Sequence, residues 1–484
     1  MITDDLDPDD WEAFRGLCHA MLDEAIDHVR DVRDRPVWQP VPEAVKAAFT
    51  EPLPAEAQGL EAVCGDFRDH VLPYATGNIH PRFFGWVHGT GTPGGILAEL
   101  LTATMNANVG GRDHGAVYVE RQVVGWFRDL FGFPATTSGL LVSGTSIATL
   151  IALAVARNKH GDGKVRHDGL GKTASLTAYT SAEAHNSVAK AFELLGLGRA
   201  ALRAVPVDEA YRMDLAALDQ AIQADRAAGH RPFAVIGTAG TVNTGAVDDL
   251  AAIADIAKTQ GLWYHVDGAF GALAALSPTL QPLLAGIEAA QSVAFDFHKW
   301  LHVPYDAACI LIRDGDAHLA AFSSREEYLA AAPRGLAGGD PWYCEYGPEL
   351  SRGFRALKVW FTLKEHGSAR IGRTIEKNCQ QAVYLGQLVD AHPTLERLAP
   401  IALNIVCFRY VVAGADVETL NRLNQEIVMD LQEQGTAAPS TTTLGGMTAI
   451  RVNITNHRSR QDDVDLLVDA VVAIGDGLCR ETPS

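Results

Sequence analysis

The sequence has little of what marks secreted, membrane-bound or nucleic-acid-binding proteins. Its seven cysteines are scattered and odd in number, without a Cys-x-x-Cys pair, so neither a disulfide framework nor a metal site is predicted. No apolar run approaches the length of a membrane span, and the first residues, MITDDLDPDD, are acidic where a targeting peptide would be basic or apolar. The net charge of −19 argues against nucleic acid or an anionic membrane as a partner. We therefore expect a cytoplasmic protein.

The length and composition predict a globular chain with more than one lobe. A chain of 484 residues with 47% hydrophobic residues can bury one large core and a smaller one. Between about residues 140 and 300, short apolar runs alternate with helical patterns, which predicts parallel strands joined by crossover helices. We expect an α/β fold with a mainly parallel central sheet, helices on both faces, and a small C-terminal α+β domain.

The central feature of the sequence is a lysine inside an apolar stretch. Lys299 stands between a histidine and a tryptophan in the stretch SVAFDFHKWLHVPYDA. Desolvation disfavours the ammonium form, so a lysine held there can serve as a nucleophilic amine of the kind that forms Schiff bases with carbonyl compounds. The alternative is an ordinary lysine whose stem crosses apolar surface while its ammonium group reaches water.

A carboxylate upstream gives the lysine a chemical context. Residues 263–267 form an apolar run that predicts a buried strand, and Asp267 ends it, followed by small residues. In open α/β sheets, ligands bind where parallel strands end. An aspartate that keeps a pyridine nitrogen protonated, with a lysine bonded to the aldehyde, is what the electron sink pyridoxal 5'-phosphate requires.

These two motifs give the chain a family resemblance. The runs His265-Val266-Asp267-Gly268-Ala269 and His298-Lys299-Trp300 resemble those of the group II pyridoxal-phosphate-dependent amino acid decarboxylases, which include the aromatic-L-amino-acid and glutamate decarboxylases. The resemblance covers nearly the whole chain from about residue 45. It implies a fold of the fold-type I PLP-dependent transferase class, pyridoxal 5'-phosphate as cofactor, an L-amino acid as substrate, and a homodimer with shared active sites.

Several further segments match the family in order, and the resemblance implies cofactor-binding roles for them. Gly144, Thr145 and Ser146 stand before a long helix, whose N-terminus can bind a phosphate through backbone N–H groups and hydroxyls. The same turn is also a common helix cap. His185 matches the histidine that stacks on the cofactor ring, although a lone histidine there is often structural. The remaining cofactor-binding candidates are Thr241, Asp267, Ala269, His298 and Lys299.

The substrate side is expected in two segments. Trp86 and His88 follow an aromatic run that matches residues lining the family's pocket, and an ordinary aromatic core is the alternative. Asn108 and Gly110 stand where aromatic amino acid decarboxylases have bulky apolar residues. That departure predicts a roomier and more polar pocket, closer to the glutamate decarboxylases.

Residues 317–351 lose helical periodicity and accumulate glycine, which predicts a mobile loop. The matching family loop carries a tyrosine that protonates the carbanion left by CO2 loss. Counting back from the segment after the loop places Tyr343 there, with Tyr346 and Tyr328 as alternatives. Protonation would give an amine. Attack by oxygen would give an aldehyde, as in the related aldehyde synthases.

The expected domains are a helical arm at residues 1–85 that wraps the partner subunit, a large PLP-binding domain at 86–355, and a small domain at 356–484. The arm has too few apolar contacts to be stable by itself. Decarboxylation to an amine with Lys299, His185 and Tyr343 as catalytic residues is the leading hypothesis. Transaminase or lyase chemistry and a non-catalytic PLP-binding relative are the others. The sequence leaves the role of Asp296 open. It favours surface positions for Arg451 and Asn453, with contact with the site as the alternative.

Overall fold

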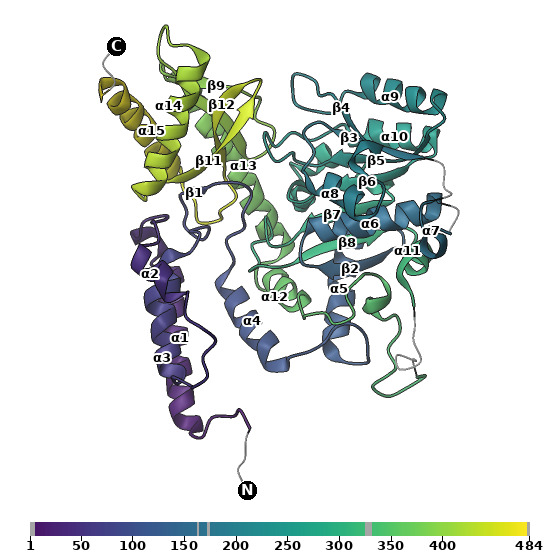
Figure 1. Cartoon of the computed structure of the whole chain (residues 1–484), viewed down its shortest axis with the longest axis horizontal. Helices are drawn as coiled ribbons and strands as arrows, with labels where there is room; N and C mark the ends of the chain where they lie inside the picture. The colour runs from purple at the N-terminus through teal and green to yellow at the C-terminus, as the bar shows by residue number, and fades with distance from the viewer. Residues whose placement is uncertain (1–4, 162–163, 172–174, 325–331, 482–484) are drawn as a thin grey trace.

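The computed structural model describes residues 5–161, 164–171, 175–324 and 332–481; Tyr328 lies outside these ranges. Figure 1 shows a large α/β part, a smaller C-terminal part beside it, and an N-terminal helical arm that extends away from both. Two hydrophobic clusters form the cores of the two parts. Within the described residues, no helix has the length and apolar character needed to cross a membrane.

The large part is built on a seven-stranded sheet in the order β2-β8-β7-β6-β5-β3-β4. Strands β4, β3, β5, β6 and β7 pair in parallel along the sheet, whereas β8 runs antiparallel to both β7 and β2. The prediction of a mainly parallel sheet is therefore confirmed. The strands are β2 (Ser138–Val142), β3 (Leu176–Ser181), β4 (Leu202–Val205), β5 (Arg231–Thr238), β6 (Trp263–Asp267), β7 (Ser292–Asp296) and β8 (Ala308–Ile312).

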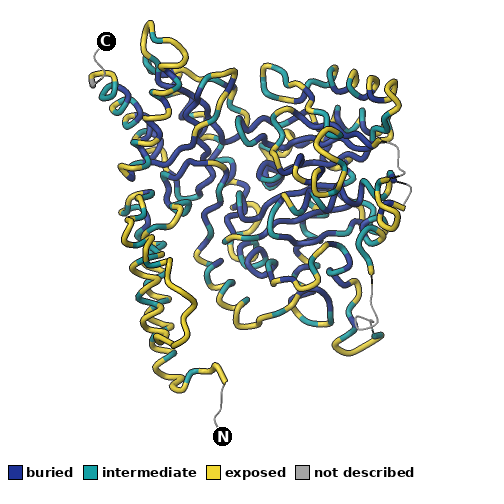
Figure 2. Tube along the Cα trace, in the orientation of Figure 1, coloured by how far each residue is buried: buried dark blue, intermediate teal, exposed yellow. Residues whose placement is uncertain are grey.

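Helices cover the faces of this sheet, so its inner strands are continuous apolar runs instead of alternating patterns. All residues of β6, β7 and β8 are buried, and Figure 2 shows the sheet as the most buried region of the chain. The helices of this part are α5 (Gly115–Leu130), α6 (Thr145–His160), α7 (Val165–Asp168), α8 (Ser187–Leu194), α9 (Leu215–Ala227), α10 (Leu250–Gln260) and α11 (Gly315–Phe322).

The C-terminal part has the α+β character that the sequence predicted. Its five-stranded sheet has the order β1-β11-β12-β10-β9, and the first strand comes from far upstream: β1 (Phe83–Phe84) pairs in parallel with β11. The other strands are β9 (Leu395–Arg397), β10 (Ile405–Tyr410), β11 (Ala438–Leu444) and β12 (Met447–Asn453). Helix α12 (Ala356–His366) leads into α13 (Ser368–Ala391), and α14 (Val417–Glu433) and α15 (Gln461–Glu481) complete the part.

The N-terminal arm consists of α1 (Trp11–Arg30), α2 (Glu43–Ala48) and α3 (Leu60–Asp66), and α4 (Pro93–Met105) follows after β1. Helix α1 begins at Trp11 because the Asp10 carboxylate accepts hydrogen bonds from the backbone N–H groups of Glu12 and Ala13. The spacing of the apolar residues from Trp11 predicted this helix, but none of its residues is buried. Figure 2 shows the arm as mostly exposed.

The structure corrects two predictions about the C-terminal half. The segment from residue 317 does not begin as a loop, since Gly315–Phe322 is a helix whose N-cap, Asp314, accepts from the N–H of Ala317. Arg451 and Asn453 are not on the surface: they are 3% and 2% exposed. The Arg451 guanidinium can be buried because the carbonyl oxygens of Asn243 and Trp86 accept its hydrogen bonds. These partners are distant in the sequence, so the local pattern could not reveal them.

Candidate active site

The candidate residues meet at one edge of the large sheet. Asp267 is the last residue of β6, and the other candidates, Thr145, His185, Thr241 and Lys299, follow within a few residues of the ends of β2, β3, β5 and β7. These five strands point in the same direction, since β8, which pairs with β2 and β7, is antiparallel to both. Their carboxyl ends therefore lie at the same edge, where open α/β sheets bind ligands.

Lys299 is held at this edge by a carboxylate. Its Nζ lies 2.9 Å from Oδ2 of Asp296, the last residue of β7, which is 3% exposed. His298 stands on the same side, with Nε2 3.7 Å from that oxygen. The backbone N–H of Ala307 donates to Nδ1 of His298, so Nε2 carries the ring hydrogen. Burial alone would raise the pKa of Asp296, but the charge of Lys299 and the hydrogen bonds from Thr145 and Lys299 outweigh it and lower this pKa.

Asp267 ends β6 beneath the same edge and is 3% exposed. Its Oδ1 accepts from the backbone N–H of Ala269 at 3.2 Å. Burial raises the pKa of this carboxyl, while the nearby charges of Lys299 and His185 oppose the rise. A buried carboxylate of this kind gains stability from a cationic partner, which a protonated pyridine nitrogen provides.

His265, two residues before Asp267, fixes the strand from behind. It is fully buried, and its ring joins Thr149 of α6 to Ser292 of β7. Trp263 also donates to the Ser292 hydroxyl, so Ser292 joins both rings. Burial lowers the pKa of His265 to about 3, so the ring is neutral. This network holds β6, β7 and α6 in register behind the site.

The turn before α6 fits a phosphate. Helix α6 starts at Thr145, and its N-cap, Gly144, provides no capping side chain. The Thr145 hydroxyl is buried and has no hydrogen-bond partner among the described residues, while Ser146 is exposed. A hydroxyl without a partner beside the N-terminus of a sixteen-residue helix is what a phosphate oxygen would satisfy.

Three other cofactor candidates are in different states. His185 is exposed, and its Nδ1 accepts from the backbone N–H of Ser187, which leaves Nε2 free to face a ligand. Thr241 is fully buried, and its hydroxyl is already bonded within its own turn, to Thr244 and the N–H of Ala246. Ala269 supplies its N–H to Asp267.

An aromatic wall faces the lysine segment. His88 lies between the rings of Trp86 and Tyr305, with centroid separations of 5.6 and 6.0 Å, and the Tyr305 ring lies 4.4 Å from that of His298. Burial and the positive charge of Lys299 lower the pKa of His88. Gly89 packs so closely on the backbone of His298 and Lys299 that a Cβ would collide with it, so the wall is fixed against the lysine segment.

Asn108 does not present its side-chain oxygen to a pocket in this subunit. Its Oδ1 accepts from the N–H of Gly110 at 2.9 Å and from the N–H of Arg352 at 3.0 Å. The carbonyl of Arg352 in turn accepts from the N–H of Val109. The side-chain oxygen of Asn108 thus stabilises a loop, while the residue itself is exposed, and its place on the substrate side stays a prediction.

A buried ion pair connects this loop to β2, the strand that precedes residues 144–146. Arg352 donates to both carboxylate oxygens of Glu120, at 2.6 and 3.3 Å, and to the carbonyls of Val109 and Leu141. Glu120 also accepts from the N–H of Leu141, in the strand that leads into Thr145. Tyr343 is 5% exposed, and its ring faces the Arg352 guanidinium at 5.1 Å. Burial raises the pKa of Tyr343 strongly.

Sequence reasoning missed Tyr305 and the Glu120–Arg352 pair. Tyr305 follows Lys299 by six positions without any motif that marks it, and Glu120 lies on a helix 232 residues before Arg352. The one available signal for Glu120 was a charged residue among the apolar positions of α5.

Comparisons with known proteins agree with this site. The model of the pyridoxal-dependent decarboxylase conserved domain matches residues 42–411. An aromatic-L-amino-acid decarboxylase of Bacillus atrophaeus is 32% identical over 98% of this chain and 97% of its own. A phenylacetaldehyde synthase of Arabidopsis thaliana is 29% identical over 93% of each. The solved structure of Oryza sativa TDC with PLP and tryptamine has a TM-score of 0.90 at 26% identity, covering 98% of this chain and 100% of that one.

The fold and the site define an enzyme of the fold-type I pyridoxal-phosphate class. The chain belongs to the pyridoxal-dependent decarboxylase family. It is a PLP-dependent decarboxylase that acts on an L-amino acid, and its cofactor is pyridoxal 5'-phosphate. The predicted family, fold, cofactor and enzyme class are thereby confirmed.

Proposed function

We propose that the protein decarboxylates an L-amino acid with an aromatic side chain to the corresponding amine. The observation that carries this proposal is the wall formed by Phe83, Trp86, His88 and Tyr305, whose neighbouring rings lie 5.6 to 6.2 Å apart beside the lysine segment. Aromatic rings prefer offset or edge-on neighbours, so this wall favours an aromatic side chain over an acidic one. The aromatic-L-amino-acid decarboxylase of Bacillus atrophaeus supports the same substrate class.

The residues at the sheet edge divide the chemistry between them in this proposal. Lys299 bonds the cofactor, and Asp267 holds its ring nitrogen protonated. Ala269 and Thr241 pack against the cofactor ring, and the imidazole face of His185 stacks on it. Gly144, Thr145 and Ser146 bind its phosphate, with His298 beside them. When bound, the cofactor supplies the sink for the electron pair that remains after CO2 leaves. Stacking aligns the bond to be broken perpendicular to the ring.

The product depends on which group protonates the carbon that loses CO2, and we assign this step to Tyr343. The Tyr343 ring faces Arg352, so its hydroxyl must move before it can donate a proton. If the carbon is not protonated, reaction with oxygen to give an aldehyde is the second candidate outcome. Incubating PLP-loaded protein in air with L-tyrosine, L-tryptophan, L-phenylalanine and L-glutamate, with products identified by mass spectrometry, separates the two. We expect amines from the aromatic substrates. In Tyr343→Phe we expect amine formation to fall by about 10²–10⁴-fold, the usual loss of an acid catalyst. Tyr346→Phe tests the alternative loop tyrosine and should keep amine formation near the original rate.

Amine production only from L-glutamate would overturn the proposal of an aromatic substrate. Aldehyde production by the unmodified protein would show that the product is not an amine. A Tyr343→Phe protein that forms amine at the original rate would remove Tyr343 from the mechanism.

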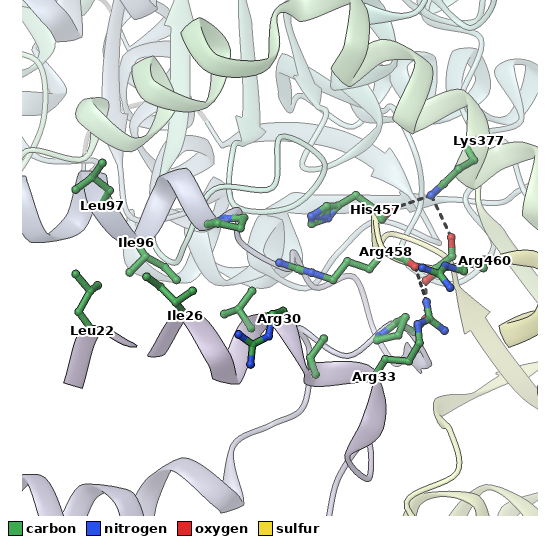
Figure 3. Close-up of a pocket in the computed structure, with 15 residues that line it drawn as sticks. Leu22, Ile26, Arg30, Arg33, Ile96, Leu97, Lys377, His457, Arg458 and Arg460 are labelled. Carbon is green, nitrogen blue, oxygen red and sulfur yellow. Dashed lines mark hydrogen bonds between the residues drawn. The ribbon is translucent and has the colours of Figure 1, made fainter. Parts of the chain in front are cut away.

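We propose that the protein is a homodimer in which a second copy covers the N-terminal arm. Helix α1 has no buried residue, and apolar side chains of α1 and α4 line the same cavity of about 710 Å³. Figure 3 shows Leu22 and Ile26 lying opposite Ile96 and Leu97 across it. Leu97 is 49% and Ile26 is 50% exposed, and α4 continues the apolar surface through Leu100, Leu101 and Met105. Contiguous exposed apolar side chains of this kind are typical of a surface that a partner covers.

The arm variant Ile26→Asp tests the dimer. We expect light scattering to report a dimer for the unmodified protein and a monomer for Ile26→Asp, since a charge cannot be buried in an apolar interface without a partner. Leu194→Asp places the same charge on an exposed leucine of α8 and should leave the dimer intact. A monomeric parent protein, or equal behaviour of the two variants, would contradict the proposal.

The division into an arm at 1–85, a PLP-binding domain at 86–355 and a small domain at 356–484 stays a proposal, as does the cytoplasmic location. The two separate sheets support the division into domains. The free thiols of all seven cysteines support the cytoplasmic location. The strand β1 is where the arm segment enters the sheet of the small domain.

A further inference from the structure

Asp296 contacts the N-terminus of α6, where the phosphate of the cofactor is proposed to bind. Its Oδ1 accepts from the backbone N–H of Thr145 at 2.7 Å, although the two residues are 151 positions apart. That amide is at the first residue of α6, where the dipole of the helix is positive. The carboxylate of β7 thus caps a helix whose own N-cap residue, Gly144, provides no side chain.

The same carboxylate also holds the lysine that bonds the cofactor. Oδ2 of Asp296 lies 2.9 Å from Lys299 Nζ at the sheet edge, where Asp296 is buried and the Lys299 side chain is 20% exposed. A lysine attacks an aldehyde as the neutral amine. To form the carbon–nitrogen bond, Lys299 must lose a proton, attack the aldehyde and expel water, so its Nζ must give up its 2.9 Å contact with Asp296.

Loading the cofactor therefore changes both partners of Asp296 at once. The phosphate brings a second anion to the Thr145 turn, where the unpartnered Thr145 hydroxyl awaits an acceptor. Bond formation at Nζ replaces the ammonium, which has three N–H donors, by an imine nitrogen that has at most one. Two anions in contact repel, so Asp296 must be displaced from Thr145 or take up a proton.

We propose that Asp296 is a built-in competitor of the cofactor phosphate, which holds Lys299 and the start of α6 in the cofactor-free protein and weakens cofactor binding. This inference rests on the proposed placement of the phosphate at residues 144–146. The consequence is a cofactor-free form in which Asp296 pairs with Lys299 and the Thr145 N–H, so the degree of loading responds to the supply of pyridoxal 5'-phosphate.

The test is Asp296→Asn, because an amide keeps the shape and the acceptor for the Thr145 N–H but lacks the charge. Cofactor-free protein is titrated with pyridoxal 5'-phosphate and, separately, with pyridoxal, which has the aldehyde without the phosphate; binding is followed by tryptophan fluorescence and by the absorbance of the bound chromophore. We expect Asp296→Asn to bind pyridoxal 5'-phosphate at least about tenfold more tightly, the factor that one pKa unit of charge interaction represents. The gain for pyridoxal should be smaller, since it arises through Lys299 alone.

The control is Asp255→Asn, which makes the same change in net charge at an exposed position of α10 and should alter neither affinity. Equal gains for both ligands would overturn the competition with phosphate, and weaker binding by Asp296→Asn would overturn the inference entirely. Failure of the proposed cofactor site looks different: neither the parent protein nor the variant would then bind pyridoxal 5'-phosphate.

Discussion

Replacing Lys299 with alanine abolishes covalent attachment of the cofactor and reduces turnover to the background rate. No other lysine is placed at the carboxyl edge of the sheet beside Asp296 and Asp267 among the described residues. The substitution also removes the ammonium that contacts the buried Asp296 carboxylate, which keeps only the Thr145 N–H at 2.7 Å and the more distant His298. We therefore expect the pKa of Asp296 to rise and the free energy of unfolding to fall by about 1–3 kcal/mol.

Lys299→Arg separates the two effects. An arginine keeps the positive charge beside Asp296 but cannot form the carbon–nitrogen bond, because its guanidinium remains protonated. Borohydride reduction followed by intact-mass measurement detects attached cofactor, and thermal melting detects stability. We expect both variants to lack attached cofactor, while the arginine variant melts closer to the parent. Attached cofactor in either variant would show that Lys299 is not the bonding residue.

Replacing Glu120 with alanine destabilises the protein by about 3–5 kcal/mol, because it leaves the Arg352 guanidinium buried without its carboxylate. Both residues are almost fully buried, and the pair also holds the carbonyls of Val109 and Leu141. Without the ion pair, β2, which leads into residues 144–146, and the loop around Asn108 both lose hydrogen bonds that hold them in place. We expect a weaker affinity for pyridoxal 5'-phosphate in the fraction that remains folded.

Urea unfolding at equilibrium measures the first effect, and cofactor titration of the folded protein measures the second. Glu418→Ala is the matched control, since its ion pair with Arg422 is exposed on α14 and should contribute less than about 1 kcal/mol. A further variant, Glu120→Leu with Arg352→Met, replaces the pair by apolar side chains and should regain much of the lost stability. An unfolding free energy unchanged in Glu120→Ala would contradict the account of this pair.

The sequence by itself determined the chemistry, because the groups involved are carried by short local motifs. Apolar runs that end in Asp267 and in Asp296-Phe297-His298-Lys299 predict buried strands with polar residues at their ends, and the topology of parallel strands brings such ends to one edge. The hydroxyl turn at Thr145 precedes a helix for the same local reason. The order of these motifs along the chain was sufficient to indicate the family, the cofactor and the class of reaction.

Only the tertiary structure decided what these groups contact. The bond between Asp296 and Thr145 spans 151 residues, that between Arg352 and Glu120 spans 232, and the reach of Arg451 to Trp86 spans 365. A polar side chain shows in the sequence that it needs a partner when it is buried, but any of many distant backbone groups can satisfy it. For this reason the sequence left Asp296 without a role and placed Arg451 on the surface, whereas packing gave both of them buried partners.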